Sequence, residues 1–250
     1  MKKIILFFTF SIFLSFYSSA QTTNNEKALE IIKKIDNNMF SKTQIVTSEM
    51  IVYGKRKKRI IRSKGYSKGK ENNYTEYLSP EREKGTKMLK LDKRLWIYSP
   101  STDRTIQLSG HLLRQSVMGS DLSYEDMMEE RKLSEVYTAE IINEDIYIDS
   151  PVWIMQLTSK VEGLAYYKRT LWIDKNKFVP LKENLYAKSG VLLKTTTFTN
   201  IKKIDSRWFP MKMNSKDMLK DGKGTDVIIL EIAFNIKIPD NYFSKNILKK

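Results

Sequence analysis

Short strand-like segments separated by polar turns follow one another from residue 43 to residue 236. Apolar and polar residues alternate within these segments, as they do in strands with one buried face. Polar turn residues recur between them, at positions 92–93, 143–145, 162–163, 174–176, 188–190 and 221–224. Hairpins of this kind build antiparallel sheets, so we expect one large antiparallel sheet of about eleven strands. A sheet of that size curls around itself and needs a cover.

One helix is predicted before the strands begin. Thr23 and Glu26 have the spacing of a helix-capping box. Apolar residues then recur at helical intervals, which predicts an amphipathic helix over about residues 24–39. The predicted fold class is therefore α+β and mostly β. We also expect residues 133–142 to form a strand and the lysine-rich residues 245–250 to be loose.

Residues 109–130 interrupt the strand pattern with a different composition. Glycine, serine and methionine are frequent there, and Ser123 and Asp126 are spaced to cap a short helix. This segment is predicted to form a loop-and-helix insertion between two parts of the sheet.

The first twenty residues predict where the chain works. Lys2 and Lys3 precede an apolar run over residues 4–17, and small residues at 18–20 form a cleavage site. This pattern is typical of a secretory signal peptide, so we expect a signal over residues 1–20 and a single mature domain over residues 21–250. The chain contains no Cys, so the mature N-terminus is not expected to carry a lipid anchor. The predicted location is the periplasm.

The net charge of +15 attracts anions in general. Outside the cytoplasm, anionic lipid is a better candidate than nucleic acid, and we expect a transient contact with an anionic membrane surface. A basic turn over residues 55–59 is one candidate for such a contact. The alternative is that the lysine-rich faces only keep the protein in solution.

Several kinds of catalytic site are disfavoured by residue content. His111 is the only histidine and there is no cysteine, so neither a Ser–His–Asp triad nor a His/Cys metal site is expected. No phosphate-binding glycine loop has the required spacing. Paired carboxylates stay open, because any two of the 29 acidic residues can meet in the fold. We predict no enzyme activity, no cofactor and no metal.

Motifs along the mature chain resemble those of the outer-membrane lipoprotein-sorting family, the LolA-like proteins. They are Ser-Pro-Glu at 79–81, Gly-Thr-Lys-Met-Leu at 85–89, Leu-Trp-Ile-Tyr-Ser-Pro at 95–100, Arg104, Ser-Val-Met-Gly-Ser-Asp-Leu-Ser-Tyr-Glu-Asp at 116–126, Leu-Trp-Ile-Asp at 171–174, Arg-Trp-Phe-Pro at 207–210, Ile-Pro-Asp at 238–240 and Phe243. The resemblance implies an incomplete β-barrel whose concave face holds acyl chains, with helices as a lid. It also implies a monomeric shuttle, loaded by an inner-membrane transporter and emptied at an outer-membrane acceptor.

Under this hypothesis, strand alternation selects residues for the apolar trough and the insertion supplies the lid. The trough candidates are Leu89, Leu91, Trp96, Tyr98, Trp153, Met155, Leu157, Trp172, Leu230, Ile232 and Phe234. The lid candidates are Arg114, Met118, Gly119, Ser120, Asp121, Tyr124, Met127 and Met128. Arg114 is the candidate for holding the lid shut or for binding a lipid headgroup, and the methionines suit varied acyl chains.

Two alternatives remain open beside the carrier of lipoproteins or lipids. An accessory subunit of an inner-membrane transporter would grip protein without lipid and would have a filled core. A secreted hydrolase would show convergent carboxylates or a serine beside a base. Each candidate trough residue can also belong to an ordinary filled core.

Overall fold

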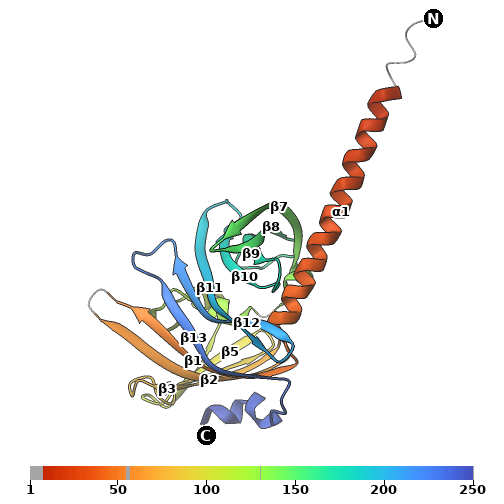
Figure 1. The fold of residues 1–250 in the computed structure, drawn as a ribbon. Coiled ribbons are helices and arrows are strands. Elements are labelled where there is room, and N and C mark those ends of the chain that lie inside the picture. Colours follow the sequence, from red (N-terminus) through yellow and green to blue (C-terminus); the bar gives the residue numbers. More distant parts are fainter. Residues whose placement is uncertain (1–7, 55–56, 130, 250) are drawn as a thin grey trace, which may run out of the picture.

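The computed structural model describes residues 8–54, 57–129 and 131–249, and the described strands form a single antiparallel sheet of thirteen (Figure 1). The strands are β1 Thr43–Tyr53, β2 Lys58–Lys68, β3 Asn72–Ser79, β4 Lys87–Leu91, β5 Arg94–Ser99, β6 Arg104–Leu108, β7 Tyr137–Tyr147, β8 Ser150–Ser159, β9 Lys168–Asp174, β10 Pro180–Tyr186, β11 Leu192–Ile204, β12 Arg207–Asp217 and β13 Thr225–Phe234. Their order is β6-β5-β4-β3-β2-β1-β13-β12-β11-β10-β9-β8-β7. The predicted fold class is confirmed, with two strands more than expected.

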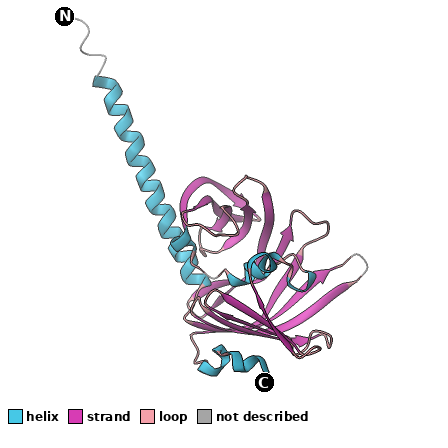
Figure 2. Ribbon diagram, turned by 180° about the vertical axis from the view of Figure 1, so that it is seen from behind, coloured by secondary structure: helices cyan, strands magenta, loops and turns pink. Residues whose placement is uncertain are grey.

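The sheet is strongly curved but does not close. Among the described strands, β6 and β7 are the two edges and do not pair with each other. All neighbouring strands along this order pair in antiparallel fashion. Most of these pairs are hairpins of consecutive strands in the chain. The curvature gives the sheet an inner and an outer side, which different segments cover (Figures 1 and 2).

Helix α1 (Phe8–Met39) packs against one end of the sheet. Ala28, Ile31, Ile32 and Ile35 are buried there, which confirms the predicted amphipathic stripe. The helix begins upstream of the predicted capping box, so Thr23 lies within it. Part of the predicted signal sequence, residues 1–7, falls outside the described residues. Within the described part of the chain, no helix has the length and apolarity needed to cross a membrane.

The predicted insertion is present on the inner side of the sheet. It contains the short helices η1 (Gly110–Arg114), η2 (Val117–Gly119) and α2 (Tyr124–Met128). The predicted cap is confirmed, since Ser123 Oγ accepts a hydrogen bond from the Asp126 N–H (3.1 Å) and Asp126 Oδ2 accepts one from the Ser123 N–H (2.7 Å). We call residues 110–128 the lid segment.

Two local predictions around β7 are wrong. Residues 133–136 form helix α3 (Leu133–Val136), because the Asp36 carboxylate on α1 accepts hydrogen bonds from the first backbone N–H groups, those of Leu133 (2.9 Å) and Ser134 (3.1 Å). Residues 143–145 do not form a turn but lie inside β7, just after a register shift. The chain turns instead at Ile148 and Asp149, which both have positive φ.

The C-terminal residues are also ordered, contrary to expectation. They form η3 (Asp240–Phe243) and η4 (Lys245–Lys249) on the outer side of the sheet (Figures 1 and 2). Leu248 is fully buried against the sheet. The Tyr242 ring lies 4.3 Å from that of Tyr66 on β2, measured between centroids. A tail rich in lysine is therefore held by its few apolar residues.

Candidate functional site

One face of the sheet lies beneath both α1 and the lid segment, and we call it the covered face. Directly paired residues of antiparallel strands share a face. A single row of such pairs crosses the sheet from β1 to β8, through Val52, Thr225, Ser215, Thr196, Glu183, Leu171 and Met155. The two ends of this row are apolar and its middle is polar. The covered face therefore has two apolar regions separated by polar side chains.

The helix region is the apolar region beneath α1. Its buried side chains are Ala28, Ile31, Ile32, Ile35, Val136, Tyr137, Met155, Leu157, Leu171 and Ile173. The predicted trough residues Met155 and Leu157 belong to it, and Trp153 packs at its margin with its ring 5.6 Å from that of Phe178. These three predicted residues are thus brought together, but α1 fills the space above them.

The lid region is the apolar region beneath the lid segment. Its buried side chains are Met50, Val52, Ile61, Tyr77, Met88, Leu95 and Val117. Partly buried side chains of the lid segment pack on it, including Met118, Tyr124 and Met128. Four methionines, two from the sheet and two from the lid, meet here. Sequence reasoning identified the lid methionines but missed Met50 and Met88.

Four predicted trough residues lie on the opposite face. Leu89 and Trp96 are buried, and Leu91 and Tyr98 partly buried, against the C-terminal residues around Leu248. The cause is that β4 is buried on both sides, so Met88 and Leu89 belong to different clusters. Alternation identifies which residues share a face, but it does not show which segment covers that face.

The remaining trough candidates are scattered. Trp172 packs with Val152 in a separate cluster. Phe234 is buried beside Phe209, 5.5 Å away between ring centroids, and Ile232 is partly buried. Leu230 is skipped by a register shift between β1 and β13 and is 40% exposed. The predicted common face of Leu230, Ile232 and Phe234 is therefore interrupted.

Arg59 on β2 fastens the tip of the lid segment. Its Nη2 donates a hydrogen bond to the backbone carbonyl of Met118 (2.6 Å). Met118 and Gly119 both have positive φ, and a Cβ on Gly119 would lie 3.1 Å from Arg59 Nη2. Glycine is thus suited both to the backbone conformation and to the close approach of the arginine.

Arg114, the residue predicted to hold the lid, does not have this role. It is exposed, and its side chain makes none of the hydrogen bonds or ion pairs found among the described residues, so Arg59 replaces it as the fastening residue. Met127 is also exposed and is not among the side chains that pack in the lid region. The only sequence signal for Arg59 was its place at the end of the basic turn.

Further hydrogen bonds join the lid segment to β12, to β13 and to the turn between them. Asp121 Oδ1 accepts a hydrogen bond from the Asp217 N–H (3.0 Å), and Asp121 Oδ2 accepts one from the Thr225 hydroxyl (2.8 Å). Lys220 Nζ donates to Ser116 Oγ (2.7 Å) and to the Ser120 carbonyl (3.1 Å). The lid candidates Ser120 and Asp121 are therefore structural parts of the closed lid.

Asp126 fastens the other end of the lid segment across the polar middle of the covered face. It forms an ion pair with the buried Lys194 on β11 and accepts a hydrogen bond from the Tyr166 hydroxyl (2.5 Å). Burial raises the pKa of Asp126, but Lys194, the Ser123 N–H and Tyr166 together lower it by more, so the net shift is downward. Burial and the Asp126 charge raise the pKa of Tyr166. Asp126 is thus held as a carboxylate.

A second buried ion pair lies beside it. Arg169 Nη1 donates to Glu183 Oε1 (2.7 Å), and Arg169 Nε donates to the Tyr137 hydroxyl (2.9 Å). Burial lowers the pKa of Arg169, but Glu183 and Tyr137 raise it by more. Within the described residues, no group of three or more His, Cys, Asp or Glu side chains is placed to hold a metal ion. The two buried ion pairs neutralise their own charges, and they separate the two apolar regions of the covered face.

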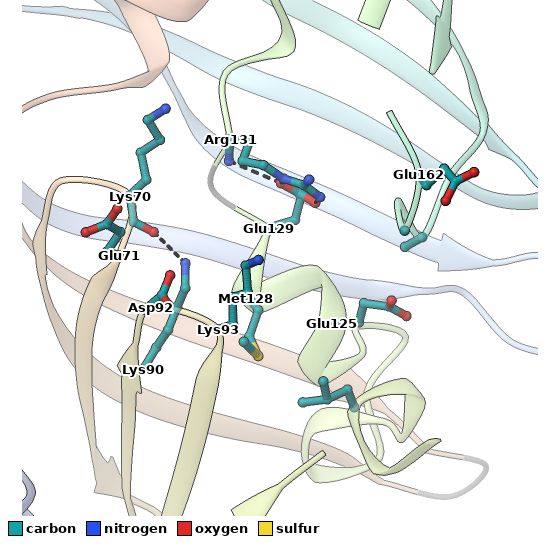
Figure 3. Close-up of a pocket in the computed structure, with 13 residues that line it drawn as sticks. Lys70, Glu71, Lys90, Asp92, Lys93, Glu125, Met128, Glu129, Arg131 and Glu162 are labelled. Carbon is teal, nitrogen blue, oxygen red and sulfur yellow. Dashed lines mark hydrogen bonds and ion pairs between the residues drawn. The ribbon is translucent and has the colours of Figure 1, made fainter. Parts of the chain in front are cut away.

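A cavity of about 530 Å³ opens beside the lid segment (Figure 3). Leu113 and Met128 contribute apolar surface, and most of its other lining residues are charged. Arg131 pairs with Glu129 on one side, and Lys90 Nζ donates to the Lys70 carbonyl (2.7 Å) on the other. The open space next to the lid is therefore polar, while both apolar regions are filled by packed side chains.

Comparisons with known proteins agree with this architecture. The model of a family described as "-like: Uncharacterized protein" matches residues 69–250. An outer membrane lipoprotein-sorting protein domain from Vibrio parahaemolyticus is similar in structure, with a TM-score of 0.78 and 25% identity over 91% of this chain and 100% of that chain. A LolA superfamily protein from Nitrosomonas europaea has a TM-score of 0.74 and 25% identity over 88% of this chain and 98% of that chain.

A DUF1329 family protein from Desulfovibrio piger shares the fold, with a TM-score of 0.80 and 23% identity over 90% of this chain and 99% of that chain. None of the curated proteins matches the chain significantly in sequence.

Proposed function

Because this chain belongs to the outer-membrane lipoprotein-sorting (LolA-like) family, we propose that it is a carrier without enzyme activity that binds the acyl chains of lipoproteins or lipids. The proposed site is the covered face of the sheet. Acyl chains would enter the lid region when the lid segment moves aside. The observation that carries the proposal is a methionine-rich apolar region closed by a segment that is fastened through polar contacts.

The composition of the lid region suits acyl chains of varied shape. Methionine is unbranched and flexible, so it adapts to irregular apolar partners. Each methylene transferred from water contributes roughly 0.8 kcal/mol. A bound chain can therefore compensate for the apolar contacts that the lid segment gives up when it opens.

The fastening contacts suit a segment that opens and closes. Arg59 is exposed, and Asp121 and Lys220 lie near the surface of the sheet end. Hydrogen bonds to charged groups contribute roughly 1.5–3 kcal/mol each, and exposure to water lowers that contribution. They hold the lid segment in place without making its release prohibitive.

The proposed cycle takes place in the periplasm. Residues 1–20 direct export and are removed, and the mature domain of residues 21–250 acts as a monomer. An inner-membrane transporter loads the carrier, and an outer-membrane acceptor or an anionic membrane surface receives the cargo. Nucleic acid has no part in this cycle.

Native mass spectrometry with lipid extraction, performed on the mature protein, tests the proposal. We expect an added mass that resolves into acyl-containing species. Arg59→Ala removes the bond to Met118, so added phospholipid or lipopeptide should bind faster than to the parent. Arg62→Ala is the matched control, since Arg62 lies on the same strand but pairs with Glu49 (2.7 Å).

The filled interior favours one alternative. Because α1 and the lid segment occupy both apolar regions, the fold also suits an accessory subunit, which would bind a transporter through its surface and would carry no lipid. If neither the parent nor the Arg59→Ala variant takes up phospholipid or lipopeptide, the carrier proposal is wrong and this alternative stands.

A further inference from the structure

The hairpin tip between β12 and β13, residues 216–224, combines exposed apolar and basic side chains. Met218 is 45% exposed and Leu219 is 72% exposed. The same tip carries three lysines, at positions 216, 220 and 223, and two aspartates, at positions 217 and 221, so positive charge is in excess. In Figure 1 this blue hairpin projects from the end of the sheet.

The neighbouring turn between β10 and β11 extends this surface. The Met218 N–H donates a hydrogen bond to the Leu193 carbonyl (2.9 Å), which ties the two turns together. Val191 there is exposed, and Lys188 lies in the same turn. An apolar tip surrounded by an excess of lysine matches the boundary of an anionic bilayer, where apolar side chains enter and ammonium groups meet phosphates.

The same tip fastens the lid segment. Lys220 donates to Ser116 Oγ and to the Ser120 carbonyl, and it lies 3.3 Å from Asp217 Oδ2. Two of these three acceptors are neutral. A lipid phosphate carries a full negative charge, which attracts the ammonium more strongly than the dipole of a hydroxyl or a carbonyl does, so it is a strong competitor for Lys220.

We propose that the β12–β13 tip docks on an anionic lipid bilayer and that docking releases the lid segment. Leu219 and Met218 enter the interface, and Lys220 exchanges Ser116 and Ser120 for lipid phosphate. This inference rests on the proposed function, because opening of the lid at the membrane is useful only if the protein delivers cargo there. The docking step itself depends only on the tip and its contacts.

A buried reporter in the lid segment tests this coupling. The chain has no Cys, and Val117 is 0% exposed, so the thiol of Val117→Cys reacts with a maleimide only when the lid segment opens. We expect the reaction to accelerate with vesicles of phosphatidylglycerol and phosphatidylcholine in equal parts, and to stay slow with phosphatidylcholine alone. Vesicle binding is measured on the same samples by flotation.

Two tip variants in this background separate the steps. Leu219→Ser should weaken binding to the anionic vesicles by about tenfold and remove their effect on the thiol. Lys220→Gln should weaken binding by about fivefold and speed the thiol reaction in the absence of vesicles. Ile146→Ser is the matched control, since Ile146 is 73% exposed on the β7–β8 hairpin, and it should behave like the parent.

The proposal is overturned if Leu219→Ser keeps full vesicle binding, or if the parent binds vesicles without any change in thiol reactivity. Equal acceleration by phosphatidylcholine alone would also overturn it. Binding of a fluorescent fatty acid without vesicles is measured separately. If the parent does not bind the fatty acid, the carrier proposal is contradicted. If Leu219→Ser binds the fatty acid but not the vesicles, that variant has lost docking alone.

Discussion

Asp121 of the lid segment and Thr225 at the start of β13 hydrogen-bond to each other twice. The Asp121 N–H donates to Thr225 Oγ1 (2.9 Å), and the Thr225 hydroxyl donates to Asp121 Oδ2 (2.8 Å). Thr225 is fully buried. The lid segment is therefore joined to β13, in the middle of the strand order, by a contact whose sheet partner is fully buried.

Thr225→Val should loosen the lid segment while leaving the sheet intact. The substitution keeps the shape of the side chain but removes both hydrogen bonds, at a cost of about 1–2 kcal/mol to the closed state. The thiol of Val117→Cys should then react about tenfold faster. Thr199→Val is the control, because Thr199 is exposed on β11. Equal rates for all three proteins would contradict the role assigned to Thr225.

Acid should open the lid segment through Asp126. Its folded-state pKa lies below the ordinary 3.8, because Lys194, Ser123 and Tyr166 outweigh the opposing effect of burial. A lowered pKa gives stability that is complete above the unfolded-state value and is lost as the pH falls through the folded-state value. Hydrogen-exchange protection of residues 123–128 should therefore hold at neutral and mildly acidic pH and disappear only below 3.8.

Asp126→Asn separates this effect from the titration of other acids. The variant leaves the buried Lys194 without its charged partner, which costs about 3 kcal/mol. Protection should already be low at neutral pH and should change little on acidification. Loss of protection in the parent near neutral pH would contradict the assignment.

The sequence allowed the strands to be predicted well but not what covers each face. Trp153, Met155 and Leu157 alternate along β8, and they do share one face beneath α1. Leu89 and Trp96 alternate just as clearly, yet the C-terminal residues cover them. That outcome depends on packing between segments more than a hundred residues apart, for which neither strand carries a local signal.

Polar residues were the other source of error. Asn143 lies in β7, which is an edge strand of the sheet. Charged and amide side chains are tolerated in an edge strand because they reach water there. Lys194 and Arg169 are buried charges within strands, and only their partners from other strands or from the lid segment make them tolerable. No spacing rule connects such partners, so the polar middle of the covered face could not be foreseen.

The Arg169–Glu183 pair should be more important for the shape of the covered face than for stability. Both side chains are largely buried, so Glu183→Gln leaves a buried arginine without its counterion and should lower the free energy of unfolding by about 3–5 kcal/mol. Replacing both, as Arg169→Met with Glu183→Leu, should recover most of that loss. Urea unfolding of the two variants and the parent measures this. A double variant as unstable as Glu183→Gln would contradict the argument.

Leu248 should anchor the C-terminal residues to the outer side of the sheet. It is 1% exposed and packs with Leu89 and Trp96. Leu248→Ala should lower the free energy of unfolding by about 3 kcal/mol, whereas Ile146→Ala, at an exposed position, should change it by less than about 0.5 kcal/mol. Both values come from urea unfolding.

The same variant tests which side of the sheet Trp96 faces. Leu248→Ala should expose the indole and shift its fluorescence to the red, and this change should vanish when Trp96→Phe is added. A fatty acid bound under the lid segment should leave the Trp96 emission unchanged, because the sheet separates the two sites. A ligand-induced shift that depends on Trp96 would place the acyl site on the outer face instead.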